Sequence, residues 1–377
     1  MNPVYGYWMQ KNPLYLAPSS FLAREWNADR LRWMFADLAD RPAVAAALLA
    51  LAENPGADRD ADTDEAAARC ERFVQGPLSI ADWRNAILAD APHVLIYPEV
   101  GMDPMAARLA ALRLAPVQCN SWGHPETSGL PTLDHFLSSD LMEPADASDH
   151  YTERLVRLPN LSVYYEPVAT TPVALTRQAL GLRDDATVFW SGQSVFKYLP
   201  QYDVVFARIA RQAPNSQFVF LRHNGSVADV FQARLARAFA AHGLDAAKHC
   251  VFLDPMGHDE FVAAMGLCDV FLDSIGWSGC NSAIEGLQHN LPIVTVAGPL
   301  MRGRHSMAIL QMMGVTETIA PTLDDYVAIA VRLAGAADER RDLSRRIAER
   351  KQRLYRDRAC ITALEDFLER AVRERAG

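Results

Sequence analysis

The chain has 377 residues, of which 50% are hydrophobic, and a formal net charge of −9 at pH 7. This length and composition allow a large buried core and predict two domains, while the acidic balance argues against a general nucleic-acid binder. No apolar run is long enough to span a membrane, the N-terminus lacks a basic segment followed by an apolar one, and the six cysteines are scattered without a CxxC pair, so we expect a cytoplasmic protein with reduced thiols.

The first half of the chain mixes helical and strand patterns. We expect helices over Ala28–Leu38, Pro42–Glu53, Ile80–Asp90 and Met105–Leu114, an exposed acidic linker at Asp58–Asp64, and strands over His93–Pro98, Pro116–Asn120, His135–Ser138 and Leu155–Leu158. A Pro-rich connection from Tyr164 to Pro172 then marks the expected domain boundary.

A polar, turn-rich loop, Gly123–Gly129, follows the expected strand Pro116–Asn120. Its His124 is a candidate acid/base group, because the pKa of an imidazole suits proton transfer near neutral pH. A single histidine in a loop is more often simply exposed, so the pattern alone leaves both interpretations open.

The second half alternates strands and helices. The strands are expected over Thr187–Trp190, Gln217–Leu221, Cys250–Leu253, Val270–Leu272 and Ile293–Val296, and the helices over Tyr202–Gln212, Ala228–His242, Asp259–Leu267 and Ser282–Gln288, with charged helices from about Asp338 to Arg373. This alternation is typical of a doubly wound parallel sheet, in which ligands bind beyond the carboxyl ends of the strands.

The turn from Gly276 to Ser282 joins such a strand end to a helix and indicates an anion site. The first amides of a helix and its dipole attract phosphate, and residues such as Asn281 and Ser282 cap helices well. Glu285 comes one turn later, where a carboxylate can accept hydrogen bonds from ribose hydroxyls. The combination predicts a nucleotide diphosphate site; the alternative is an ordinary strand-loop-helix with a solvated glutamate.

Other polar residues follow neighbouring strands. Gln193 and Lys197 come after Thr187–Trp190, where a lysine can neutralise a departing phosphate. His258 and Phe261 are spaced to offer an edge and a flat face to a nucleobase, although core packing would explain Phe261 equally well. The basic residues after Ile293–Val296 add positive charge near the diphosphate or form a solvated loop: Arg302, Arg304 and His305.

Three segments resemble the catalytic region of the SPINDLY and O-GlcNAc transferase family, which also contains bacterial adhesin-modifying protein N-glycosyltransferases. They are RLAPVQCNSWGHPETSGLPTLDHFLSSDLMEP, GQSVFKYLPQYD and DVFLDSIGWSGCNSAIEGLQHNLPIVTVAGPLMRGRHSMAILQMMGV, in family order within roughly residues 65 to 335. The resemblance implies the α/β GT-B fold, with two Rossmann-like domains facing a cleft. It also implies an inverting, metal-independent transfer from a UDP-sugar to a protein side chain, with no cofactor.

The resemblance also assigns roles. Gln193 and Lys197 match diphosphate and uridine contacts, His258 and Phe261 match the uracil site, and Glu285 stands where the family has a ribose-binding Asp. The diphosphate turn is matched by Gly279, Cys280, Asn281 and Ser282, with His305 also on the donor side, and the loop beside the donor sugar by Gly123, His124, Pro125, Thr127 and Ser128. Lys197 and His124 are the candidate catalytic residues.

We expect an acceptor-side domain over 1–165, a donor-binding domain over 173–355 and a C-terminal helix over 356–377. The family's first buried strand and its His-bearing loop are not evident in residues 1–50, so the first domain is expected to be shortened or diverged. The predicted function is transfer of GlcNAc or a hexose to a polypeptide. The alternatives are a non-catalytic UDP-sugar-binding protein and a GT-B enzyme acting on a small molecule or glycan; neither the acceptor nor the oligomeric state follows from the sequence.

Overall fold

The computed structural model describes residues 68, 72–76, 78–98, 100–167, 170–223 and 225–376. The chain divides into two compact units: unit 1 is Met1–Glu166 with Arg356–Gly377, and unit 2 is Pro167–Tyr355. The expected helices Ala28–Leu38 and Pro42–Glu53, the linker Asp58–Asp64 and the expected shortening of the N-terminus lie outside the described residues.

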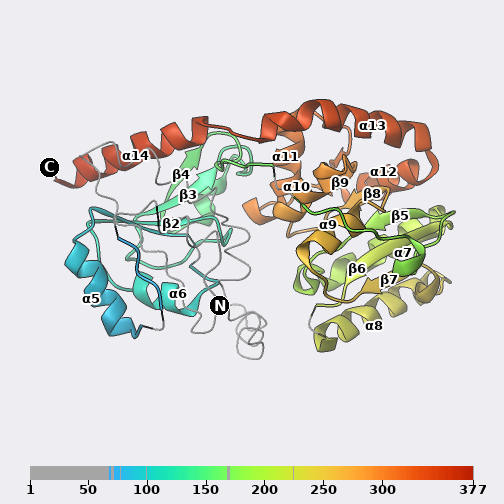
Figure 1. Ribbon diagram of the computed structural model, residues 1–377, viewed down its shortest axis with the longest axis horizontal. Coiled ribbons are helices and arrows are strands. Elements are labelled where there is room, and N and C mark those ends of the chain that lie inside the picture. The colour runs from blue at the N-terminus through green and yellow to red at the C-terminus, as the bar shows by residue number, and fades with distance from the viewer. Residues whose placement is uncertain are drawn as a thin grey trace. The chain divides into compact units, whose positions relative to one another are not determined.

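Unit 1 contains a parallel sheet in the order β1-β2-β3-β4 (Figure 1). Its elements are α5 (Ile80–Asp90), β1 (Val94–Tyr97), α6 (Pro104–Ala110), β2 (Val117–Ser121), β3 (His135–Ser139), η1 (Ala147–His150), β4 (Arg154–Leu158) and α14 (Ala359–Ala376). Successive strand residues point to opposite faces, so Leu95 and Tyr97 pack with α5 and α6 while Val94 and Ile96 pack with α14.

Helix α14 belongs to unit 1 although it follows unit 2 in the chain. Leu364, Phe367 and Leu368 share one buried cluster with Leu137 of β3 and Leu158 of β4. The sequence-based division had set 356–377 apart as a separate helix. Its apolar stripe covers a sheet face that would otherwise be open, which assigns the helix to unit 1.

Unit 2 is a six-stranded parallel sheet between two layers of helices (Figure 1). Its elements are η2 (Gln178–Leu180), β5 (Thr187–Trp190), η3 (Val195–Lys197), η4 (Pro200–Tyr202), α7 (Asp203–Gln212), β6 (Ser216–Leu221), α8 (Gly225–Ala241), η5 (Ala246–Lys248), β7 (Cys250–Leu253), α9 (His258–Met265), β8 (Val270–Leu272), α10 (Asn281–Gln288), β9 (Ile293–Val296), η6 (Met301–Gly303), α11 (His305–Met313), β10 (Ile319–Ala320), α12 (Leu323–Gly335), α13 (Ala337–Arg350) and η7 (Lys351–Leu354).

The strand order of unit 2 predicts where a ligand binds. The sheet runs β10-β9-β8-β5-β6-β7, so the chain starts in the middle, builds outward to β7 and then returns to β8 on the other side of β5. Parallel connections are right-handed, so the two halves of the sheet receive their helices on opposite faces. The crevice opens where the direction reverses, at the carboxyl ends of β5 and β8.

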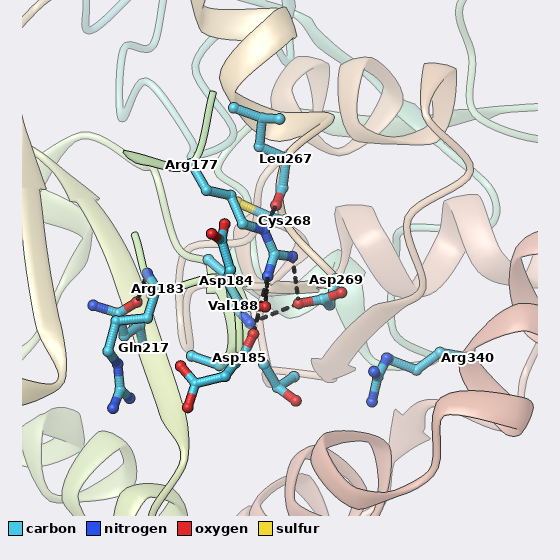
Figure 2. Close-up of polar contacts among 12 residues, drawn as sticks. Arg177, Arg183, Asp184, Asp185, Val188, Gln217, Leu267, Cys268, Asp269 and Arg340 are labelled. Carbon is cyan, nitrogen blue, oxygen red and sulfur yellow. Dashed lines mark hydrogen bonds and ion pairs between the residues drawn. The ribbon is translucent and has the colours of Figure 1, made fainter. Parts of the chain in front are cut away.

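A polar network lies at the opposite edge of this sheet, where strands β5 and β8 begin (Figure 2). Arg177 donates to Asp269 Oδ2 at 2.9 Å and to the carbonyl oxygen of Leu267 at 3.0 Å, and the amide of Val188 donates to the same Asp269 oxygen at 2.8 Å. These contacts join the segment before β5 to the start of β8. Their role is to hold the two central strands together, away from the crevice.

The observed elements agree closely with those expected, apart from three helices and the short strand β10, which was not expected. The sequence pattern placed the end of α6 at Leu114, but the helix ends at Ala110, because the Gln118 side chain accepts the amides of Leu114 and Ala115. Helices α11 and α12 were not expected. α11 is buried on almost every side and shows little amphipathic period, whereas Thr322, which caps α12, was an available signal.

Candidate functional site

The predicted phosphate turn lies at the crevice of unit 2. Gln193 and Lys197 follow β5, and residues 273–282 follow β8, so the two central strands deliver both segments to the same edge. Helix α10 begins at Asn281 with Cys280 in the cap position and without a side-chain capping bond. The expectation that Asn281 or Ser282 caps this helix was therefore wrong.

The Ser282 hydroxyl serves another purpose. Gln193, buried at 4% exposure, donates from Nε2 to Ser282 Oγ and accepts at Oε1 from Lys197 Nζ at 3.0 Å. A hydrogen-bonded chain thus runs from the lysine to the first turn of α10. It places an ammonium group and the positive end of a helix dipole beside each other, as a diphosphate site requires.

Gly279 makes this approach possible. A Cβ atom at this position would lie 2.8 Å from both Gln193 Nε2 and Ser282 Oγ, closer than such atoms come in real structures. The glycine is therefore needed for close packing of the turn against the β5 segment.

The turn rests on a buried carboxylate that the sequence analysis did not single out. Asp273, 3% exposed, accepts the amide of Gly279 at 2.7 Å, the Ser278 hydroxyl at 2.6 Å and the Thr295 hydroxyl at 2.7 Å. Burial raises the pKa of Asp273, while these hydrogen bonds act in the opposite direction. An acidic residue directly after an apolar strand and before a glycine-rich turn was the signal that could have found it.

The start of α11 is tied to the same turn. The Ser306 amide donates to Ser278 Oγ at 2.9 Å, and the Ser306 hydroxyl donates to the Gly279 carbonyl at 3.1 Å. His305, the first residue of α11, is buried. The guanidinium carbon of Arg302 lies 5.4 Å from the centroid of the Trp277 ring. Arg304 donates a hydrogen bond to the Gly298 carbonyl oxygen at 3.2 Å.

A stacked tyrosine fixes the segment that carries Gln193 and Lys197. Tyr198 packs face to face on Phe231 of α8, with ring centroids 4.6 Å apart. Its hydroxyl donates to the Ser191 carbonyl and accepts the Gln193 amide at 3.2 Å. Arg234 of α8 donates a hydrogen bond to the Tyr198 carbonyl oxygen at 2.8 Å, so α8 fixes the position of this segment.

The predicted base and ribose residues meet at the start of α9. His258 is the first residue of this helix, and its Nε2 donates to Glu285 Oε1 of α10 at 2.8 Å. Phe261 lies one turn further and packs edge-to-face on Trp190 at 5.2 Å. The half-buried Phe261 thus packs on the core at Trp190, the last residue of β5.

The predicted loop of unit 1 is a fixed structure rather than an exposed turn. His124 is 7% exposed and lies against Gly101, where a Cβ would come within 2.9 Å of His124 Nδ1. Gly101 has a φ of +107°, which favours glycine in addition. The hydroxyls of Thr127 and Ser128 both donate to Glu153, a residue that the sequence analysis did not name.

Comparison with known proteins decides the family. The model of the family described as Glycosyl transferase family 41 matches residues 162–359, which are 198 of the 377 residues. The chain belongs to glycosyl transferase family 41. The resemblance found in the sequence is therefore confirmed, and the match includes every donor-side residue discussed above.

Two curated relatives illustrate the range of this family. The chain is 32% identical over 228 residues to a protein of Arabidopsis thaliana named probable UDP-N-acetylglucosamine–peptide N-acetylglucosaminyltransferase SPINDLY, covering 59% of this chain and 24% of the relative. It is 24% identical over 272 residues to the UDP-glucose:protein N-beta-glucosyltransferase of Actinobacillus pleuropneumoniae, covering 71% of this chain and 42% of that protein. The chain spans about a quarter of the length of its SPINDLY relatives.

A solved structure supports the fold of this family 41 chain. A mutant of the Thermobaculum terrenum O-GlcNAc transferase superposes with a TM-score of 0.75 at 23% identity, covering 93% of this chain and 66% of that one. The predicted α/β fold of the GT-B class is confirmed. Among the helices that the structure describes, none is both long and apolar enough to cross a membrane.

Proposed function

We propose that this chain is an inverting glycosyltransferase that moves GlcNAc or a hexose from a UDP-sugar to a protein side chain. The observation that carries the proposal is the chain Lys197–Gln193–Ser282 at the start of α10, where the strand order of unit 2 reverses. The names of the relatives support both kinds of donor sugar and a peptide or protein acceptor. The donor sugar is therefore an outcome of the test below.

The donor-side roles follow from charge and position. Lys197 and the first amides of α10 stabilise the diphosphate, Glu285 accepts hydrogen bonds from the ribose, and His258 with Phe261 holds the uracil. In the structure Glu285 is already oriented by His258. A carboxylate has several acceptor positions, so a ribose hydroxyl can donate to it beside the imidazole.

The reaction is a single displacement at the anomeric carbon. An acceptor oxygen or nitrogen forms the new bond as the bond between the anomeric carbon and the phosphate oxygen breaks, and UDP leaves with the electron pair. Negative charge therefore grows on the β-phosphate, where Lys197 and the α10 dipole act. The acceptor proton passes to a base, for which His124 is the candidate.

Donor binding requires no divalent metal, because the ammonium of Lys197 and the helix amides supply the positive charge. We also place the activity in the cytoplasm, which the five cysteines outside any disulfide in the described part of the chain support.

The test is mass spectrometry of candidate acceptor proteins incubated with UDP-GlcNAc or UDP-glucose, with UDP release measured in parallel. We expect a mass increase of one sugar on the acceptor with one of the donors. UDP binding without release under either donor would identify a binding protein instead. Release onto a small molecule or glycan, with no labelled protein, would identify the other GT-B alternative.

A further inference from the structure

The loop Gly123–Gly129 is fastened to unit 1 by one carboxylate. Glu153, the residue before β4, is 5% exposed. Its Oε1 accepts the Ser128 amide at 2.9 Å and the Ser128 hydroxyl, and its Oε2 accepts the Thr127 hydroxyl at 2.6 Å. The neighbouring Thr152 hydroxyl donates to Oε2 at 3.2 Å.

This bonding pattern favours the ionised carboxylate. Burial alone would raise the pKa of Glu153, but the hydrogen bonds from Ser128 and Thr127 outweigh it and hold the pKa below its usual value. Oε1 accepts hydrogen bonds from Ser128, and Oε2 accepts hydrogen bonds from Thr127 and Thr152. Thr127 and Ser128 in turn donate their hydroxyl protons inward, to Glu153, so their contribution to the loop is structural.

The other end of the loop is fixed as well. Trp122 precedes Gly123, is buried, and donates from Nε1 to Ser162 Oγ at 2.6 Å. Between the two anchors, the Glu126 amide donates to the His124 carbonyl at 2.9 Å, and the imidazole lies against Gly101. His124 is therefore held in a loop that is tied down on both sides.

We propose that Glu153 is a positioning residue that holds the loop Gly123–Gly129 in one conformation and thereby fixes the orientation of His124. As far as it concerns catalysis, this inference rests on the proposed function. Transfer requires the reacting groups to lie within a fraction of an ångström of the productive geometry, so a loosened loop lowers the rate even though Glu153 itself touches no substrate.

The chain offers a matched control. Glu143 is also 5% exposed and also in unit 1, but its carboxylate accepts from Ser138 and Tyr151, neither of which belongs to the loop. Glu143→Gln therefore tests the general cost of removing a buried charge from this unit. The test variants are Glu153→Gln, which keeps the shape, and Glu153→Ala, which removes all four hydrogen bonds.

The first measurement is amide hydrogen exchange of the loop, which needs no substrate. In Glu153→Ala the Ser128 amide should exchange faster by about ten- to a hundredfold, the size expected from losing a hydrogen bond to a charged acceptor. Glu153→Gln should show a smaller increase, and Glu143→Gln none in this loop. Unchanged exchange in a folded Glu153→Ala variant would overturn the proposal.

The second measurement is kinetic. Glu153→Ala should lower kcat by about ten- to a hundredfold while the KM for the UDP-sugar stays within about twofold. Thr127→Val should lower it less, and the double variant should be no slower than Glu153→Ala, because both act through one contact. Additive losses, or a kcat equal to that of Glu143→Gln, would overturn the positioning role.

Failure of the two proposals can be told apart. If the parent protein transfers no sugar, the proposed function falls, and the exchange measurement alone still decides whether Glu153 holds the loop. If the parent is active and the loop of Glu153→Ala exchanges as in the parent, only the role of Glu153 falls.

Discussion

At the scale of single residues, the candidate donor site is built from pairs that lie far apart in the sequence. Gln193 and Ser282 meet across 89 positions, and His258 meets Glu285 across 27. The polar atoms of the buried Gln193 would cost free energy without a partner, so its bond to Ser282 fixes its side chain. Variants of Lys197, which donates to Gln193, and of Glu285 test whether these residues serve a nucleotide sugar.

Lys197→Ala should abolish most transfer and leave UDP binding nearly intact. The ammonium acts on charge that develops on the β-phosphate, so its loss should lower kcat by about two to three powers of ten. Lys197→Arg should restore only part of the rate, because a planar fork fits a point-charge site poorly. Turnover at saturating donor, beside UDP titration of the same preparation, is the measurement. A rate within about tenfold of the parent in the Ala variant contradicts the leaving-group role.

Glu285→Ala should weaken UDP binding by about 1.5–3 kcal/mol, the range for hydrogen bonds to a charged group. The melting temperature should change little, because its partner His258 is one-third exposed and can be hydrated once the carboxylate is removed. Calorimetric titration with UDP measures the change, and Glu349→Ala, on the exposed face of α13, is the control. Full affinity together with a large drop in melting temperature would make Glu285 a structural residue.

At the scale of elements, the turn before α10 and the loop before β3 are each fastened by one buried acid. Asp273 holds the turn through the Gly279 amide and two hydroxyls, and Glu153 holds the loop through an amide and hydroxyls. A carboxylate can accept several hydrogen bonds at once, so a single side chain suffices to order a segment that has no regular structure.

Gly279→Ala should weaken UDP binding by at least about tenfold, because the new methyl group displaces Gln193 or Ser282 from the turn. Gly335→Ala is the matched control, since a Cβ at the end of α12 meets nothing within 4 Å. Binding by calorimetry should be normal in the control. Equal affinity of both variants would show that the close approach at Gly279 is not needed for UDP.

The pH dependence of the free energy of unfolding should show how much the ionised Glu153 carboxylate stabilises the fold. Its pKa is lowered in the folded protein, so its stabilising contribution is complete above the unfolded pKa of about 4.3 and is lost as the pH falls through the folded value. The free energies of unfolding of the parent and of Glu153→Gln should therefore differ at neutral pH and converge as the pH falls through the lowered folded pKa. Urea unfolding at a series of pH values measures this. A constant difference across the range would show that the carboxylate charge has no role.

At the scale of the whole molecule, the chain builds two parallel-sheet units, each with its own buried hydrophobic residues, and the family match spans the whole of the second. All donor-side residues lie in unit 2, so UDP recognition is expected to be a property of that unit. The candidate base and its loop lie in unit 1.

UDP should bind equally well in EDTA and in excess magnesium, because Lys197 and the amides of α10 provide the positive charge that a metal supplies elsewhere. Calorimetry in the two buffers is the measurement. Affinity that is lost in EDTA and restored by magnesium or manganese would contradict metal-independent binding.

The sequence by itself determined most strands of unit 2 and the helices between them up to α10, and it predicted the segments that carry the candidate donor site. Strands β5, β8 and β9 were expected with the bounds that the structure shows, because a strand buried on both faces needs only local hydrophobicity to be recognised. The turn at Gly279 and the positions of Gln193, Lys197 and Glu285 followed from their places at strand ends.

Only the tertiary structure decided which distant segments come together. It brought α14 onto the sheet of unit 1, buried Asp273 under the turn, and joined Glu153 to the loop. From the sequence, an acidic residue is expected to be exposed to solvent. The hydrogen-bond donors that make its burial favourable come from other segments, so the neighbouring sequence does not predict them. These contacts depend on the strand order and on chain reversals that periodicity does not encode, so they appear only once the sheets are assembled.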